Sequence, residues 1–285
     1  MIIDSHTHIF SKDLIAHRND LSERDERFRE CYSSPKAKMV TAAELVQEME
    51  RAGVDRTVVT GYAFADGTLC AASNDYIIEA IKAFPDKLVG LAAIQPLEGD
   101  RALYEAERCY VAGLRGLGEL TADGQGFDLT EPALFHDLAA ITIKYKAVIM
   151  LHASEPLGHL YPGKGKTTPD KILALAQHHP ECNIIAAHWG GGLPFYELMP
   201  EVAKALSNLY YDTAATTYLY RFGVFRAVCD LAGAHKILWA SDYPLLGQAR
   251  LLERVRKEAM LNETELELVL GGNAARLLGL EERGE

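Results

Sequence analysis

MIIDSHTHIF, residues 1–10, combines an apolar, strand-like start with two histidines that are one residue apart. Successive side chains of a β-strand point to opposite faces, so Asp4, His6 and His8 are expected to share one face. Two imidazoles at a strand end can bind one metal ion or form a polar cluster, and the pair alone does not decide between these roles. The decision depends on what the other strands of the fold contribute.

Short apolar runs of the same kind recur along the chain, separated by longer amphipathic stretches. Almost wholly apolar strands are typical of a parallel sheet that is covered on both faces. Eight such strand–helix units most simply close into a (β/α)8 TIM barrel, an α/β fold, so we expect a single domain over residues 1–285. A doubly wound open sheet is the alternative, but no Gly-x-Gly-x-x-Gly follows an early strand. The expected strands are residues 2–4, 56–60, 88–94, 115–119, 147–151, 183–187, 209–212 and 237–240.

Helix starts between these runs carry capping signals. TAAE at 41–44 is a capping box, and TP at 168–169 places an N-cap before a proline at the first helical position. NETE at 262–265 begins a C-terminal helical segment, expected at about 262–280. Residues 11–40 form a long charged insertion after the first strand, either a solvated helical surface or a lid that contacts the substrate.

The composition is that of a globular protein, with 48% hydrophobic and 24% charged residues. A net charge of −11 argues against nucleic-acid binding and against attraction to an anionic membrane. No apolar run is long enough to cross a bilayer, and no signal peptide is visible. The five cysteines are scattered, as expected for buried thiols in a reducing cytoplasm.

Polar residues follow the apolar runs at five strand ends, where a barrel collects its chemistry. Each alone has a structural explanation, such as a core histidine, a turn cap for Asp242 or an ion pair of Glu119 with Arg115 or Lys144. Together they indicate a metal site, because burying isolated charges and imidazoles is costly. Three imidazoles and a carboxylate suit Zn²⁺ or a similar divalent ion, which would bring the pKa of a bound water to about 7. The convergent residues are His6, His8, Glu119, His152, His188 and Asp242.

This set of motifs resembles the amidohydrolase superfamily, in particular the amidohydrolase-related branch that includes aminocarboxymuconate-semialdehyde decarboxylase and other decarboxylases, hydratases and lactonases. The resemblance covers essentially the whole chain. It rests on IDSHTHIF, GLGEL, LHASE, AAHWGG, WASDYP and the closing VLGGNAARLLGL. These motifs are specific to the superfamily but not to one reaction.

The resemblance implies that His6, His8, His152 and Asp242 bind one divalent metal ion, with Zn²⁺ favoured. It implies catalytic roles for His188, which activates water, and for Asp242, which handles the proton. Glu119 is the least secure transfer, because many members have a carboxylated lysine on this strand. Glu119 is either a fifth ligand or a bridge to a second ion that His188 also binds.

A small carboxylated substrate would need cationic or hydroxyl partners in the loops. Trp189 could form a wall of the pocket or pack in the barrel. The candidates for substrate binding are Arg27, Arg29, Tyr62, Tyr161, Lys164, Lys166 and Trp189.

The first interpretation is a metal-dependent hydrolase that uses a metal-bound hydroxide to attack an amide, ester or lactone. A non-oxidative decarboxylase or a hydratase acting on an unsaturated carboxylic acid is the alternative on the same site. A metal-independent lactonase is a further alternative. The expected partner is a small-molecule substrate, and a homodimer is one option for the assembly, because barrels of this size are often dimers.

Overall fold

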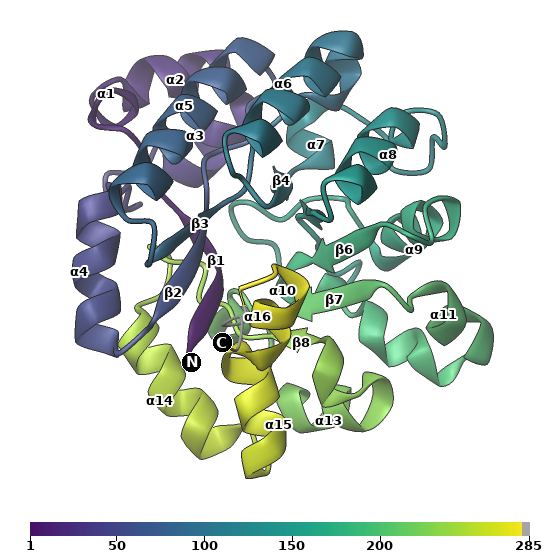
Figure 1. The fold of residues 1–285 in the computed structure, drawn as a ribbon. Coiled ribbons are helices and arrows are strands. Elements are labelled where there is room, and N and C mark those ends of the chain that lie inside the picture. The colour runs from purple at the N-terminus through teal and green to yellow at the C-terminus, as the bar shows by residue number, and fades with distance from the viewer. Residues whose placement is uncertain (281–285) are drawn as a thin grey trace, which may run out of the picture.

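The computed structural model describes residues 1–280, in which eight parallel strands alternate with helices around a barrel (Figure 1). All eight predicted strands are confirmed, with ends shifted by a few residues. The largest difference is at the first strand, which continues through both histidines. The strands are β1 Ile3–His8, β2 Arg56–Thr60, β3 Leu88–Gly90, β4 Gly116–Leu120, β5 Val148–Leu151, β6 Asn183–Ala186, β7 Leu209–Asp212 and β8 Ile237–Leu238.

Backbone hydrogen bonds close the sheet. Strands β1 to β3 form one continuous parallel sheet and β4 to β8 form another. At the β3–β4 junction, Ala92 N donates to Gly116 O at 2.9 Å and Gly118 N donates to Ala92 O at 2.8 Å. At the β8–β1 junction, Ser5 N donates to Trp239 O at 2.9 Å. The (β/α)8 barrel is therefore the observed fold.

Helices surround the strands (Figure 1). They are α1 Lys12–Ala16, α2 Arg18–Arg24, α3 Glu26–Tyr32, α4 Ala42–Ala52, α5 Gly67–Ala83, α6 Asp100–Val111, α7 Ala122–Gln125, α8 His136–Lys144, α9 Pro169–His178, α10 Ala187–Gly190, α11 Pro200–Ala205, α12 Thr216–Leu219, α13 Val224–Ala232, α14 Gln248–Glu258, α15 Glu263–Glu267 and α16 Asn273–Leu277. The 3₁₀ helices are η1 Pro96–Glu98, η2 Leu193–Leu198 and η3 Ala234–Lys236, and η4 Leu268–Gly272 is a π-helical turn. None of the helices in the described residues is both long and apolar enough to span a membrane.

Two of the three predicted helix caps form as expected. Thr41 and Asn262 each accept a hydrogen bond from the backbone three residues later, and the glutamate there completes the capping box. Pro169 is the first residue of α9, but the Thr168 side chain accepts no capping hydrogen bond; its hydroxyl donates to Asp170.

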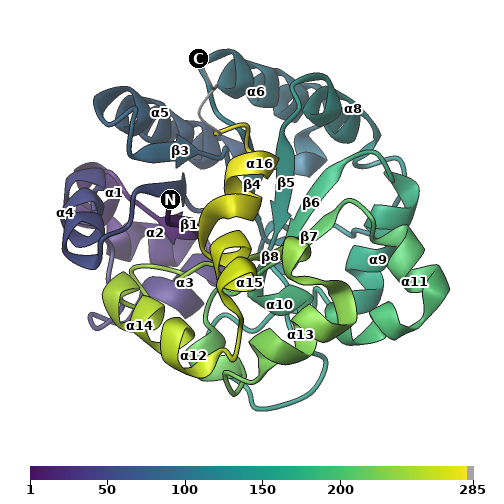
Figure 2. The ribbon, with the colours of Figure 1, turned by 60° about the horizontal axis from the view of Figure 1, so that its bottom comes forward.

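The C-terminal segment closes the lower end of the barrel. Ile3, Val58 and Val148 point into the interior there and pack with the apolar side chains of α16 and the residue after it. Figure 2 shows α16 lying across this end, where it contacts β1 and β8. The closing motif of the sequence therefore serves packing, while the opposite end of the barrel stays available for polar residues.

Residues 11–40 form the helices α1 to α3 and their connections. Phe28 is fully buried, and its ring packs with Tyr32, Tyr62 and Phe64. The insertion therefore has a packed inner side, which brings α3 to the mouth of the barrel.

Candidate active site

A β-bulge in β1 aims both histidines into the barrel. Asp4 pairs with Thr57 and Thr7 pairs with Val59, so β1 uses one residue more than β2 between these pairs. The extra residue reverses the alternation of side chains. Asp4 consequently turns outward, where its carboxylate accepts a hydrogen bond from Gln248 in α14 at 2.8 Å. The expectation that Asp4 shares a face with the two histidines is therefore wrong.

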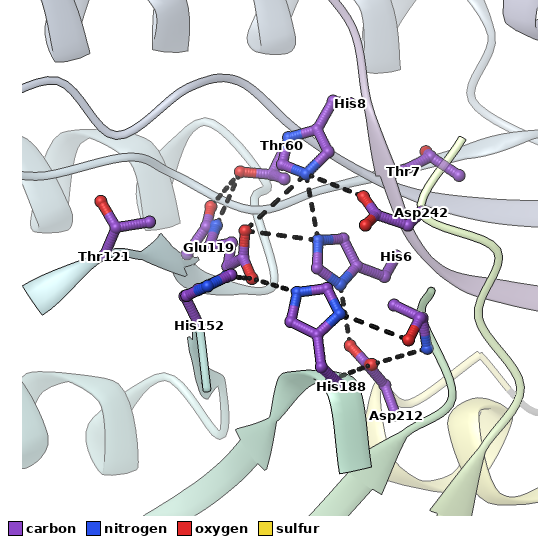
Figure 3. A network of polar contacts seen from close by, with 12 residues as sticks. His6, Thr7, His8, Thr60, Glu119, Thr121, His152, His188, Asp212 and Asp242 are labelled. Carbon is purple, nitrogen blue, oxygen red and sulfur yellow. Dashed lines mark hydrogen bonds and ion pairs between the residues drawn. The ribbon is translucent and has the colours of Figure 1, made fainter. Parts of the chain in front are cut away.

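The six predicted residues at strand ends come together at one point of the mouth (Figure 3). The Nε2 atoms of His6 and His8 are 3.1 Å apart and lie 3.6 and 3.8 Å from Glu119 Oε2. The other carboxylate oxygen, Oε1, lies 3.0 Å from His152 Nδ1 and 3.3 Å from His188 Nε2. Asp242 Oδ1 is 3.5 Å from His8 Nε2. Neither Arg115 nor Lys144 pairs with Glu119 in the described residues; Lys144 instead pairs with Glu107.

Hydrogen bonds at the far side of the rings fix the orientation of the histidines. His6 Nδ1 lies 2.8 Å from Asp212 Oδ2, and His8 Nδ1 lies 3.1 Å from the carbonyl oxygen of Gly61. Each Nδ1 thus donates a proton, so Nε2 is the nitrogen available to a metal ion at the centre. Sequence reasoning missed Asp212, although it ends the seventh apolar run just as the other site residues end theirs.

Two ionised carboxylates, those of Glu119 and Asp242, make the centre favourable for positive charge. Burial opposes ionisation of Glu119, but the charges of His6 and His152 and hydrogen bonds from His152 and His188 hold its pKa well below the usual range. Burial likewise opposes protonation of His188, but the Glu119 carboxylate raises the pKa of that imidazole to about 9. Burial also disfavours the Asp242 carboxylate, yet the neighbouring histidines lower its pKa to about 2. In metal-free protein, protons on His6 and His188, whose pKa values are both raised, balance the carboxylates of Glu119 and Asp242.

The donor set fits a divalent metal ion. Atoms that bind one ion at about 2.1 Å lie about 3.0–3.5 Å from each other, close to the separations observed here. His6, His8 and Glu119 offer ligand atoms that all lie within 4.8 Å of one another, and so do Glu119, His152 and His188. Buried imidazoles backed by carboxylate and carbonyl acceptors are the usual surroundings of such ligands.

A cavity of about 410 Å³ opens above these residues. Of the predicted substrate residues, Arg27, Tyr62 and Tyr161 line this cavity. Arg27 is 8% exposed, and one of its terminal nitrogens lies 3.3 Å from His152 Nε2. Lining residues that sequence reasoning did not single out include Tyr32, Lys38, Thr121, His159, Tyr218 and Leu245. They lie on loops and short helices, where no local pattern marks a side chain as facing the cavity.

The structure places the remaining predicted substrate residues elsewhere. Arg29 is exposed and pairs with Glu26, because two residues along a helix turn a side chain almost to the opposite face. Lys164 donates to carbonyl oxygens of its own loop and borders a neighbouring cavity, and Lys166 is not part of the lining. Trp189 is fully buried, where its indole N–H donates to Thr216 Oγ1 at 2.9 Å. For Trp189, packing in the barrel is thus the observed role.

Several known proteins similar to this chain are decarboxylases. The 2-amino-3-carboxymuconate-6-semialdehyde decarboxylase of Dictyostelium discoideum is 24% identical over 281 residues, covering 83% of this chain and 76% of that protein. The structure of 5-carboxyvanillate decarboxylase from Sphingomonas paucimobilis matches with a TM-score of 0.79 at 19% identity, covering 98% of each chain. A dihydroxybenzoic acid decarboxylase from Polaromonas with bound manganese matches with a TM-score of 0.71 at 20% identity, covering 99% of this chain and 97% of that one. These relatives favour the decarboxylase alternative over the hydrolase interpretation.

A family model described as amidohydrolase matches residues 3–280. This range contains the whole barrel and all six residues of the central cluster. The match agrees with the resemblance noted from the motifs. The chain therefore belongs to the amidohydrolase family of enzymes.

Proposed function

We propose that this protein is a metal-dependent, non-oxidative decarboxylase of a small aromatic or unsaturated carboxylic acid. The observation that carries the proposal is the placement of Arg27, a buried cation 3.3 Å from His152 in a cavity lined by tyrosines. A planar acid fits such a cavity, with its ring against the aromatic side chains and a carboxylate at the guanidinium. The decarboxylase relatives support this choice of reaction.

The proposed metal ligands are His6, His8, His152 and Asp242, with Glu119 as a further ligand beside them. When bound, a divalent ion would supply Lewis-acid polarisation of the substrate oxygens and charge neutralisation. Zn²⁺ suits the imidazole-rich set, and the manganese of a structural relative makes Mn²⁺ the other ion to test.

The chain's own residues account for substrate orientation and for the proton. Arg27 would orient one carboxylate, and Tyr62 and Tyr161 would hold the ring. Loss of CO₂ breaks the bond between the carboxylate and a ring or vinyl carbon, and the electron pair stays on that carbon until a proton replaces the carboxylate. His188 would supply this proton: its Nδ1 donates to the carbonyl oxygen of Ala214 at 3.3 Å, and because, despite burial, Glu119 raises the pKa of the ring to about 9, Nε2 carries a second proton at the cavity. Asp242 would accept protons from the opposite side of the cluster.

A substrate panel tests the reaction class. The panel contains hydroxybenzoic acids, carboxylated vanillic acids, unsaturated dicarboxylic acids, lactones and amides, assayed with Mn²⁺ or Zn²⁺ at a measured metal content. We expect CO₂ release from at least one of the acids. Hydrolysis or hydration without CO₂ release would overturn the proposal, and activity that survives complete chelation would overturn its metal dependence.

A matched pair of variants tests the role of Arg27. Arg27→Met should raise KM for the acid by about tenfold or more, because a charge-assisted hydrogen bond is worth at least about 1.4 kcal/mol. Arg29→Met, on the exposed side of the same helix, should leave KM unchanged. Equal effects of the two substitutions on KM would show that Arg27 does not bind the substrate.

A further inference from the structure

A fully buried carboxylate lies behind the metal-binding residues and does not face the cavity. Asp4, Ser241 and Gln248 are all 0% exposed. Asp4 belongs to β1, Ser241 to the turn after β8 and Gln248 to the start of α14. Hydrogen bonds therefore join β1 to two segments that lie more than 200 residues later in the chain. The turn after β8 carries Asp242, so the junction bears on the position of that residue.

The Asp4 carboxylate receives four hydrogen bonds. Ser241 donates to it twice, from the backbone N at 2.9 Å and from Oγ at 2.5 Å. Gln248 Nε2 donates at 2.8 Å, and the backbone N of His6 donates at 3.3 Å. All four partners are donors, which matches the acceptor capacity of a carboxylate and leaves an amide at this position with one mismatched atom.

These contacts hold both neighbours of Asp242. Ser241 is bound directly, and its Oγ accepts a hydrogen bond from Tyr243 N at 3.0 Å. Between them, Asp242 has φ of 62°, a left-handed conformation that is unfavourable for a residue with a Cβ atom. Asp242 N also donates to His6 O at 3.0 Å. The surrounding hydrogen bonds therefore impose the conformation that turns the Asp242 carboxylate toward His8.

We propose that Asp4 is a positioning residue of the metal centre: through Ser241 it holds the left-handed turn at Asp242 against β1, and so sets the distance between Asp242 and the two histidines of that strand. The β-bulge is what makes this arrangement available, because it lets one strand present Asp4 outward and both histidines inward. This inference rests on the metal centre of the proposed function.

The test compares Asp4→Asn and Ser241→Ala with Asn273→Asp. Asn273 is a matched control, because its buried amide donates to Ala234 O and Ile237 O at the other end of β8, away from the metal centre. Each purified protein is freed of metal, and its affinity for Mn²⁺ and for Zn²⁺, its Tm, and its kcat and KM with saturating metal are measured.

We expect Asp4→Asn and Ser241→Ala to weaken metal affinity by about tenfold to a hundredfold, the usual effect of changing a residue that orients ligands. The variant Asp4→Asn/Ser241→Ala should be about as weak as Asp4→Asn alone, because both substitutions remove the same contact. The loss in kcat should exceed any change in KM, since Asp4 does not touch the cavity. Asn273→Asp should lower Tm and keep its affinity for metal.

The inference is overturned if Asp4→Asn lowers Tm as Asn273→Asp does but keeps the metal affinity and kcat of the unmodified protein. If the unmodified protein itself binds neither ion, the proposed metal centre fails instead. The two failures are therefore distinguishable.

Discussion

At the scale of single residues, Asp212 determines the tautomer and the ring orientation of His6. One carboxylate oxygen lies 2.8 Å from His6 Nδ1, while the other accepts hydrogen bonds from the backbone N of His188 at 2.9 Å and of Ala214 at 3.0 Å. The same side chain thus fixes the tautomer of one proposed ligand and the backbone of the proposed proton donor.

Asp212→Asn should weaken Mn²⁺ or Zn²⁺ affinity by about tenfold to a hundredfold. The amide oxygen would keep the two backbone donors, so the NH₂ group would face His6 Nδ1 and favour the tautomer whose Nε2 carries the proton. Metal titration monitored by calorimetry checks this expectation. Unchanged affinity together with unchanged folding would show that Asp212 does not control the tautomer.

The protonation of His188 should make the stability of the metal-free protein pH-dependent. Burial opposes its charge, but Glu119 raises its pKa to about 9, above the value of about 6.5 expected in the unfolded chain. Because folding raises this pKa, the stabilisation is complete below about pH 6.5 and is lost as the pH rises through about 9. The difference corresponds to about 3 kcal/mol in the free energy of unfolding.

Urea unfolding of metal-depleted protein between pH 6 and 10 measures this loss. In His188→Gln the decrease should be smaller, because the titrating group is gone. Identical pH profiles for both proteins would contradict the assignment.

At the scale of elements, turns at the strand ends aim the site residues. The turn after β6 has positive φ at five consecutive residues, from His188 at 55° to Gly192 at 95°. Glycines occupy the last three of these positions at no steric cost, which explains the triple glycine after His188-Trp189. The two residues with side chains are held by hydrogen bonds, from His188 N to Asp212 and from Trp189 to Thr216.

Helix α16 is expected to contribute to stability and not to catalysis, because it packs at the end of the barrel opposite the candidate site. Leu278, next to this helix, is 4% exposed and packs in the apolar cluster at the lower end of the barrel. Leu278→Ala should lower the free energy of unfolding by about 2–4 kcal/mol through lost burial and a residual cavity. Denaturant unfolding and steady-state kinetics at the same temperature check both parts of the prediction: kcat should not change in the folded protein. A large loss of kcat would show that the lower end of the barrel influences the site.

At the scale of the whole molecule, closure of the barrel assembles the centre. His6 and Asp242 are neighbours only because β8 pairs with β1, where Asp242 N donates to His6 O at 3.0 Å. Every proposed ligand comes from a different strand end except the His6–His8 pair. A bound ion would therefore link β1, β4, β5 and β8 and favour the folded state.

Mn²⁺ or Zn²⁺ should consequently stabilise the metal-depleted protein by about 2.7 kcal/mol at an ion concentration one hundred times Kd. The measurement is Tm against metal concentration, with His6→Ala/His8→Ala as the control that should show no shift. A Tm that does not respond in the unmodified protein would contradict a metal centre linking these strands.

The sequence by itself determined the eight strands, the barrel, and five strand ends bearing histidine or carboxylate residues, because burial periodicity and chain order are local properties. It did not determine that β1 has a bulge, so regular strand alternation predicts the wrong face for Asp4.

Only the tertiary structure decided that Arg27 faces the cavity while Arg29 and Trp189 do not, and that Asp212 supports His6. These relations join residues that are far apart in the chain. Their distances are fixed by barrel closure and helix rotation, which no local pattern encodes.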